Sequence, residues 1–311
     1  MAFTENREPF GEYSKLSIKH NESSNEIEII PEMGARLNHF QVNMHGESID
    51  IIDGYSDSVA LAEESRSKSS FLAPYPNRVA DGQYEFSGKS YQLDINKPSE
   101  NNSIHGFVSD QEFEVISSEI VDDYYEVVLH SVSEGAPGYP FPFSVVITYR
   151  FGGVWLQVET ELTNIGDCKI PAGFGWHPYF KIGESIDRLR LSLPKVEKIE
   201  VDERLIPIGE KIEYSNFSAL SQIGDIELDT GFHMLGTQKE VQLFDESHGV
   251  YVTISMVGEG YDYVQLYIPP CRESIAIEPM TCAANAFNNG WGLKTLKKDE
   301  SLKASFTIVA S

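Results

Sequence analysis

The sequence of 311 residues has few cysteines, few basic residues and no long hydrophobic run. Its three cysteines are odd in number and form no C-x-x-C pair, so we expect free thiols in a reducing compartment and no disulfide framework. No apolar stretch approaches the ~18 residues that a membrane span needs. The first twenty residues lack the apolar core of a signal peptide. These absences predict a cytoplasmic protein.

Positive charge is also scarce. The chain has 24 Lys and Arg residues against 48 Asp and Glu residues, which gives a formal net charge of −24. Such an acidic surface repels phosphate backbones and anionic lipids, so neither nucleic acid nor a membrane is an expected partner. It also disfavours polyanionic substrates, although a local basic pocket can override that effect.

Long helical patterns are missing as well, and the dominant hydrophobic period is two residues. Within 154–162, Val, Leu, Val, Thr and Leu fall on one face, and Trp, Gln and two Glu fall on the other, as in a half-buried antiparallel strand. Similar alternation or short apolar runs predict further strands at 125–129, 144–149, 189–193, 250–254 and 303–308. The only helix candidates are short pieces at 58–66 and 293–298.

The strand signals continue along the whole chain, separated by Gly- and Pro-containing turns. No internal repeat, low-complexity tract or linker interrupts them, and hydrophobic residues make up 41% of the sequence, enough for a sizeable core. We therefore predict an all-β fold, a single domain over 1–311 built as a large antiparallel β-sandwich.

Several common catalytic signatures are absent too. The sequence has no Gly-rich phosphate loop, no nucleophile elbow and no Cys-His signature. Two histidines and a glutamate could in principle ligate zinc, but no pair has a short ligand spacing such as H-x-x-x-H. We therefore expect no metal and no other cofactor.

Two short blocks each hold one proton-transfer side chain among aromatic, small and apolar residues. His177 lies within Phe174–Phe180 and Glu278 lies within Ile277–Asn288. Proline follows each of them and disfavours the α region for the residue before it, so both are expected on extended backbone at a strand end. An imidazole with its ordinary pKa of ~6.5 is a usable acid or base, and a carboxylate in an apolar block usually has a specific partner. The two suit an acid and a base that serve one substrate; a buried structural histidine is the alternative for His177.

Three further polar residues are candidates for substrate binding. Arg78 precedes a turn in a segment stiffened by proline and aromatic residues, and its planar cationic fork suits sugar oxygens or a carboxylate. A surface salt bridge is the alternative. His105 stands before a glycine in a polar loop, where it can donate a hydrogen bond to a ligand or serve the fold alone. Asp229 is by itself compatible with an ordinary turn residue.

Taken together, these blocks resemble the aldose 1-epimerase family. Four matches follow one another in the family's order, and the resemblance spans residues from about 30 to the C-terminus. The matches are Asn77-Arg78 with Asp81-Gly82 and Gly88-Lys89, then Asn96 with Ile104-His105-Gly106, then His177-Pro178-Tyr179-Phe180, and last Glu278-Pro279-Met280-Thr281 with Asn285-Ala286-Phe287-Asn288. One matching block alone is weak support for the resemblance, whereas four blocks in the family's order are specific to it.

The resemblance implies a β-supersandwich with a sugar cleft on one face and a monosaccharide as partner. Glu278 matches the general base and His177 the general acid. Arg78 and His105 match the residues that orient the sugar and assist at the ring oxygen, and Asp229 matches a hydroxyl-binding aspartate.

Two neighbours of these residues are also expected at the sugar. Asn77 precedes Arg78 in the first block, and Trp176 precedes His177 in the third. Trp176 stands where many relatives have a small polar residue, which leaves the shape of the pocket and the preferred sugar open.

The expected reaction is the interconversion of the α and β anomers of an aldohexose such as galactose or glucose. Glu278 is expected to be ionised at pH 7, given its ordinary pKa of ~4.3, and neighbouring negative charge is expected to keep His177 more protonated than free imidazole. A hexose 6-phosphate or another acidic sugar is the alternative substrate, and a non-catalytic sugar-binding protein on the same fold is the alternative function. Either a monomer or a homodimer is compatible with the sequence.

Overall fold

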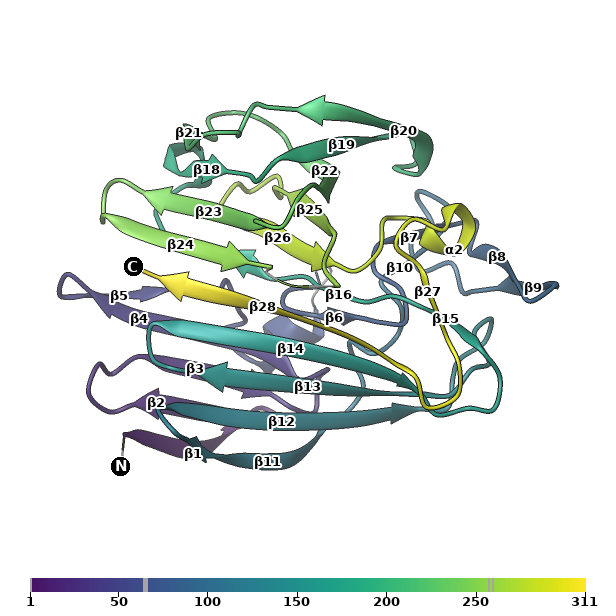
Figure 1. Cartoon of the computed structure of the whole chain (residues 1–311). Helices are drawn as coiled ribbons and strands as arrows, with labels where there is room; N and C mark the ends of the chain where they lie inside the picture. The colour runs from purple at the N-terminus through teal and green to yellow at the C-terminus, as the bar shows by residue number, and fades with distance from the viewer. Residues whose placement is uncertain (1, 64–66, 257, 259) are drawn as a thin grey trace.

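The computed structural model describes residues 2–63, 67–256, 258 and 260–311, which form two layers of antiparallel β-sheet (Figure 1). One layer is a nine-stranded sheet that runs in Figure 1 from β11 at the bottom to β18 and β21 at the top. In sheet order its strands are β11 (Glu114–Val121), β12 (Tyr124–Ser133), β13 (Phe143–Phe151), β14 (Trp155–Asn164), β28 (Ser301–Ala310), β24 (Val250–Ser255), β23 (Glu240–Asp245), β18 (Arg190–Ser192) and β21 (Ser221–Gln222).

The other layer consists of two sheets. The first is five-stranded and follows the chain: β1 (Phe3–Phe10), β2 (Tyr13–His20), β3 (Glu26–Ile30), β4 (Arg36–Met44) and β5 (Glu47–Asp50). The second is eight-stranded and joins distant segments in the order β20 (Pro207–Tyr214), β19 (Val196–Val201), β22 (Asp229–Met234), β25 (Tyr263–Tyr267), β26 (Ile275–Met280), β16 (Gly175–Trp176) and β6 (Phe71–Leu72), with β17 (Tyr179–Phe180) also pairing with β26.

A continuous apolar core fills the space between the layers. Phe40 of the five-stranded sheet meets Phe151 of the nine-stranded sheet, with ring centroids 6.0 Å apart. Further along, Trp176 of the eight-stranded sheet stacks on Phe306 of β28 at 4.9 Å. Since both sheets of the second layer bury their faces against the same partner, the fold is the large antiparallel β-sandwich that the sequence predicts, and the prediction is confirmed.

The period-two pattern explains how individual strands are placed. In β14, buried side chains alternate strictly with half-buried ones, so that Leu156, Val158, Thr160 and Leu162 face the core. The five other predicted strands correspond to β12, β13, β18, β24 and β28. Alternation thus fixes which face each strand buries.

Shorter elements gather at one end of the sandwich, on the right in Figure 1. They are the pairs β7 (Arg78–Ala80) with β10 (Asn102–Ile104), β8 (Gln83–Phe86) with β9 (Lys89–Gln92), and β15 (Ile170–Ala172) with β27 (Lys294–Leu296), and the helix α2 (Ala286–Asn289). The predicted helix at 293–298 is therefore wrong, because its centre pairs with β15 as a strand. These elements carry part of the candidate site.

Two other short helical elements occur. One of them, α1 (Ser58–Ala62), begins where Asp57 caps the backbone N–H groups of the first turn, which confirms the first part of the predicted helix at 58–66. Residues 64–66 of that prediction lie outside the described residues. The other is a single 3₁₀ turn, η1 (Ile186–Arg188).

None of the three cysteines, all of them among the described residues, forms a disulfide. Among the residues that the structure describes, none of the helices has the length and apolar character that crossing a membrane requires.

Candidate active site

The two proton-transfer residues face each other across one sheet ladder. β26 pairs with β16 at Gly175–Met280 and with β17 at Tyr179–Ala276. This register places His177, between the two short strands, directly opposite Glu278. Their side chains meet, with Nε2 of His177 3.3 Å from Oε1 of Glu278.

Backbone hydrogen bonds hold His177 in extended conformation from its other side. Its N–H donates to the carbonyl of Ser70 at 3.0 Å, and its carbonyl accepts from the N–H of Ser69 at 2.8 Å. Glu278 also has extended backbone, but it lies inside β26 and not at the strand end that the sequence predicts. The difference arises because the neighbouring strand, not β26, is interrupted at this level.

The same register brings further polar groups to the face that holds the pair. Gln265 of β25 is opposite Glu278, and Gly231 of β22 is opposite Gln265. Glycine at position 231 leaves room for the side chain of Gln265, because a Cβ at this position would lie 3.0 Å from Oε1 of Gln265. Gln265 donates from Nε2 to Oδ1 of Asp229 at 2.6 Å, so the row ends on a carboxylate.

These side chains line a cavity of about 640 Å³. The pair His177 and Glu278 is only 5% and 2% exposed, so it lies at the bottom of the cavity. The other lining residues come from the eight-stranded sheet, from the pair of β7 and β10, and from nearby loops. They are Ser67, Asn77, Arg78, Asn96, Lys97, Glu100, Ile104, His105, Gly106, Ser109, Tyr179, Asp229, Gln265 and Tyr267. All the predicted site residues except Trp176 are thus brought together.

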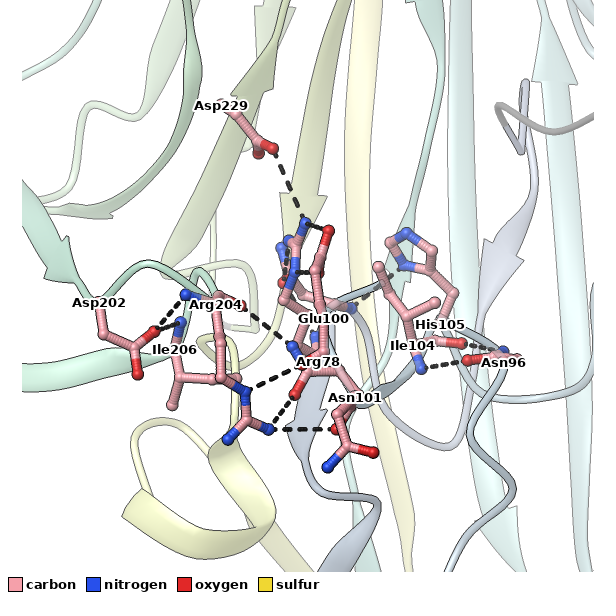
Figure 2. A network of polar contacts seen from close by, with 12 residues as sticks. Arg78, Asn96, Glu100, Asn101, Ile104, His105, Asp202, Arg204, Ile206 and Asp229 are labelled. Carbon is pink, nitrogen blue, oxygen red and sulfur yellow. Dashed lines mark hydrogen bonds and ion pairs between the residues drawn. The ribbon is translucent and has the colours of Figure 1, made fainter. Parts of the chain in front are cut away.

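Arg78 enters the cavity between two carboxylates (Figure 2). Its Nε lies 2.6 Å from Oε2 of Glu100, and its Nη2 lies 3.7 Å from Oδ2 of Asp229. Asn77 accepts from both the backbone N–H of Arg78 at 2.9 Å and its Nη1 at 3.2 Å. The guanidinium is therefore fixed in orientation before any ligand binds, and Asn77 acts on it through its side-chain oxygen.

His105 is held by its backbone and by one ring nitrogen. The side chain of Asn96 forms two hydrogen bonds with the backbone of Ile104, the residue before His105. It donates to the carbonyl of Ile104 at 2.9 Å and accepts from the N–H of Ile104 at 2.8 Å (Figure 2). The N–H of Asn77 donates to Nδ1 of His105 at 3.3 Å. Burial, reinforced by the positive charges of nearby residues, lowers the pKa of His105 well below 6.5. The neutral ring therefore carries its proton on Nε2, which is free to donate to a ligand.

Burial also governs the protonation of the central pair. It raises the pKa of Glu278 well above its ordinary value, with the charge of Asp229 adding to the rise and that of Arg78 opposing it. Burial lowers the pKa of His177 to about 3. The expectation of a more protonated His177 is thus contradicted. The pKa of Glu278 is shifted upward from the ordinary value on which its expected ionisation rests, because loss of water disfavours its charge more than Arg78 favours it.

Two buried atoms of the pair lack partners within the described part of the chain. They are Nδ1 of His177 and Oε2 of Glu278. Buried polar atoms are normally hydrogen-bonded, so each of these two atoms has unused hydrogen-bonding capacity.

The prediction that Trp176 contacts the sugar is wrong. Strand alternation turns it to the opposite face from His177, so its side chain is 0% exposed in the core and absent from the cavity wall. It stacks on Phe71 and Phe306, and its Nε1 donates to the carbonyl of Ser69 at 3.1 Å. Trp176 therefore supports the segment beside His177 and does not reach the cavity.

Gln265 and Glu100 are two of the cavity residues that the sequence-based prediction did not include. Gln265 interrupts an apolar strand and is only 6% exposed, and a lone buried amide of this kind is a usable signal. Glu100 lies in a polar loop, where nothing in the local sequence distinguishes it from a solvated carboxylate.

Within the described ranges of the chain, no group of three or more His, Cys, Asp or Glu side chains is arranged to hold a metal ion. The polar atoms of the cavity are instead hydrogen-bond donors and acceptors set around one acid–base pair, an arrangement that suits a polyhydroxylated ligand.

The aldose 1-epimerase family model matches residues 15–309. The chain belongs to the aldose 1-epimerase family. Among its relatives is the uncharacterized protein YihR of Escherichia coli (strain K12), which is 29% identical over 245 residues, or 76% of this chain and 77% of that protein. Human galactose mutarotase is 26% identical over 169 residues, 53% of this chain, and the match spans about half of the mutarotase, 48%.

Solved structures of the family share the fold. A galactose mutarotase-like protein from Clostridium acetobutylicum superposes with a TM-score of 0.88 at 20% identity, covering 99% of this chain and 98% of that one. Galactose 1-epimerase from Lactobacillus acidophilus NCFM gives a TM-score of 0.84 at 16% identity over 99% of this chain and 98% of that one. At these identities the likeness shows the fold alone.

Proposed function

We propose that this member of the aldose 1-epimerase family interconverts the α and β anomers of a free aldohexose such as galactose or glucose. The observation that carries the proposal is the pair of His177 and Glu278, which face each other across the ladder at the bottom of a polar cavity. Mutarotation needs two proton transfers at oxygens bonded to the same carbon, so its acid and base must lie close together.

In the proposed reaction, Glu278 takes the proton of the C1 hydroxyl while the bond between C1 and the ring oxygen breaks. The electrons of that bond go to the ring oxygen, which receives a proton from His177. The open aldehyde rotates about the C1–C2 bond, and the reverse transfers close the ring to the other anomer. Because the two groups exchange roles on closure, neither can have a fixed protonation state.

The pair needs one proton in total for this cycle. With the proton on His177 and Glu278 ionised, the pair can open the ring; with the proton on Glu278, it can close the ring. The raised pKa of Glu278 and the lowered pKa of His177 favour the second form in the unliganded cavity. A sugar hydroxyl that donates to the unpartnered Oε2 of Glu278 would stabilise the carboxylate of the first form.

The other cavity residues suit the binding of hydroxyl groups. In this proposal His105 donates from Nε2, Asp229 accepts, and Arg78 donates near the ring oxygen. Asn77 keeps Arg78 oriented, and Gln265 keeps Asp229 oriented.

The test is polarimetry of freshly dissolved α-D-galactose and α-D-glucose with wild type and Glu278→Gln. The substitution keeps the shape of the side chain and removes the base, so it should lower the catalysed rate by at least ~100-fold, as positioned acid–base groups contribute ~10²–10⁴. Glu246→Gln, at an exposed surface carboxylate, is the matched control and should keep full activity.

Near-normal turnover by a folded Glu278→Gln variant would contradict the mechanism. If the wild type accelerates neither sugar, calorimetry with the same sugars distinguishes a non-catalytic binder from a protein that takes a modified sugar.

A further inference from the structure

We propose that Glu100 is a specificity-determining residue whose carboxylate, positioned by Arg204, compensates the charge of Arg78 and makes the cavity select uncharged sugars over anionic ones. This inference rests on the proposed function and deepens it by naming the substrate class.

Arg78 is the buried cation of the cavity, and its donors are mostly taken by the protein. Its side chain is nearly enclosed, with the residue 7% exposed. Glu100 receives Nε at 2.6 Å and Nη2 at 3.4 Å, and Asn77 receives Nη1 at 3.2 Å. A guanidinium so far removed from water needs a counter-charge, and Glu100 supplies it through two contacts.

The backbone that carries Glu100 is held in place beside Arg78. Arg204, in the connection between β19 and β20, donates from Nε to the carbonyl of Glu100 at 2.9 Å and from Nη2 to the carbonyl of Asn101 at 3.1 Å (Figure 2). Asp202 accepts a hydrogen bond from the backbone N–H of Arg204 at 2.9 Å and so holds the backbone of Arg204 in place. Figure 2 shows the two arginines approaching the same short segment, one holding its backbone and the other its carboxylate.

The ionisation of Glu100 is consistent with this role. Burial opposes the charge of its carboxyl group, but the hydrogen bond and positive charge of Arg78 lower its pKa. The carboxylate is therefore present at neutral pH and is paired with the one guanidinium that the described cavity residues provide.

The remaining charges of the cavity do not favour an anion. Among the described lining residues, the cations are Arg78 and Lys97, and the acidic groups are Glu100, Asp229 and Glu278. Lys97 is exposed. An incoming carboxylate must either displace Glu100 from Arg78 or lie unpaired beside it, and both outcomes weaken binding relative to a hydroxymethyl group.

The test compares two sugars that differ only at C6, α-D-galactose and α-D-galacturonate, by anomer exchange at pH 7. In 1 M NaCl the Debye length is about 3 Å, so the net charge of the whole molecule is screened and local pairing remains. Wild type should prefer galactose in kcat/KM by at least about tenfold, the size of a typical charge-pairing effect. If the wild type prefers glucose to galactose, α-D-glucose and α-D-glucuronate provide the same comparison.

Glu100→Gln should reduce this preference about tenfold or more, because Arg78 then keeps only the longer ion pair with Asp229 and can pair with the substrate carboxylate. Arg204→Gln should shift the ratio in the same direction by less, since Glu100 is then loosened but still charged. The shift in ratio separates a positioning role for Arg204 from a general loss of structure, which would lower both rates together. Glu246→Gln is the control and should leave the ratio unchanged.

A wild-type ratio in folded Glu100→Gln, or a wild-type enzyme that prefers galacturonate, would overturn the inference. If Glu100→Gln does not fold, Arg204→Gln decides in the same way. If wild type accelerates no sugar, charged or uncharged, the proposed function fails first, and the two failures are thus distinguishable.

Discussion

At the scale of single residues, His177 and Glu278 titrate as one unit and not as two separate groups. Nε2 of His177 lies 3.3 Å from Oε1 of Glu278, and both side chains are buried. Close titratable groups lose and gain protons in steps that belong to the pair. The raised pKa of Glu278 and the pKa of about 3 for His177 mean that this pair holds one proton over a wide pH range.

The pair should therefore give a broad pH–rate profile. Between about pH 4 and the raised pKa of Glu278, the single proton that the proposed cycle needs stays in place, so the catalysed rate should show no inflection at ~6.5, where a free imidazole titrates. Polarimetry from pH 4 to 9, with the spontaneous rate subtracted, measures this. A catalysed rate that changes with a midpoint near ~6.5 would show instead that His177 titrates alone.

Single residues also show where sequence reasoning succeeds and where it stops. Proline and apolar neighbours single out His177 and Glu278, but the pairing between them depends on register across about a hundred residues of intervening chain. The prediction that Trp176 contacts the sugar is wrong, because aromatic character does not tell a core side chain from one that lines a cavity. The local sequence of Glu100 does not reveal Arg78 as its partner.

At the scale of elements, strands with clear alternation or a continuous apolar run could be predicted, and most of the shortest strands could not. A ten-residue strand such as β14 has enough alternation to fix its faces. β7 and β27, each of three residues, have too few positions to show a period, and long-range pairing determines their conformation. The site depends on these short elements, so its geometry is the part that the sequence leaves undetermined.

One turn beside β10 shows how closely these elements are packed. Gly106 follows His105, has φ of +66°, and approaches Ala73 so closely that an added Cβ would lie 1.9 Å from the carbonyl oxygen. Gly88, in the turn between β8 and β9, has a similar φ of +75° with nothing within 4 Å of that position. A substitution at Gly88 thus tests backbone strain alone, whereas the same substitution at Gly106 tests backbone strain and steric clash together.

Gly106→Ala should therefore be much more destabilising than Gly88→Ala. The second variant should lose about 1–2 kcal/mol from the left-handed backbone alone, and the first should lose at least about 2 kcal/mol more from the clash. Urea unfolding of both variants measures the difference. Gly106→Ala should also raise KM for the sugar, because relief of the clash displaces His105. Equal losses of stability in the two variants would contradict this account of the turn.

At the scale of the whole molecule, the two-layer arrangement follows from period-two strands that each bury one face. The sheet order does not follow from it, since β26 lies between β25, close in sequence, and the strands β16 and β17, about a hundred residues earlier. This junction of distant segments places His177 and Glu278 in the buried part of the sandwich. The stability of the molecule is thereby linked to the protonation of its site.

The linkage has a definite sign for Glu278. Its pKa is raised in the folded protein, whereas in the unfolded chain it ionises near ~4.3. Above ~4.3 the unfolded state has released a proton that the folded state keeps, so the contribution of this group to stability falls as pH rises, by about 1.4 kcal/mol per pH unit, until the folded pKa is reached. The contribution of this group is fully present below ~4.3 and is lost toward higher pH.

Glu278→Gln should consequently become more stable relative to wild type as pH rises from 4 to 8, although it is expected to be inactive. Urea unfolding of both proteins across this range gives the difference directly, and Glu246→Gln reports the effect of removing one exposed negative charge. A difference between Glu278→Gln and wild type that does not vary with pH would show that Glu278 is already ionised in the folded protein. If the linkage is correct, the difference stops growing at the pH where the catalysed rate of wild type begins to fall, because both report the same proton.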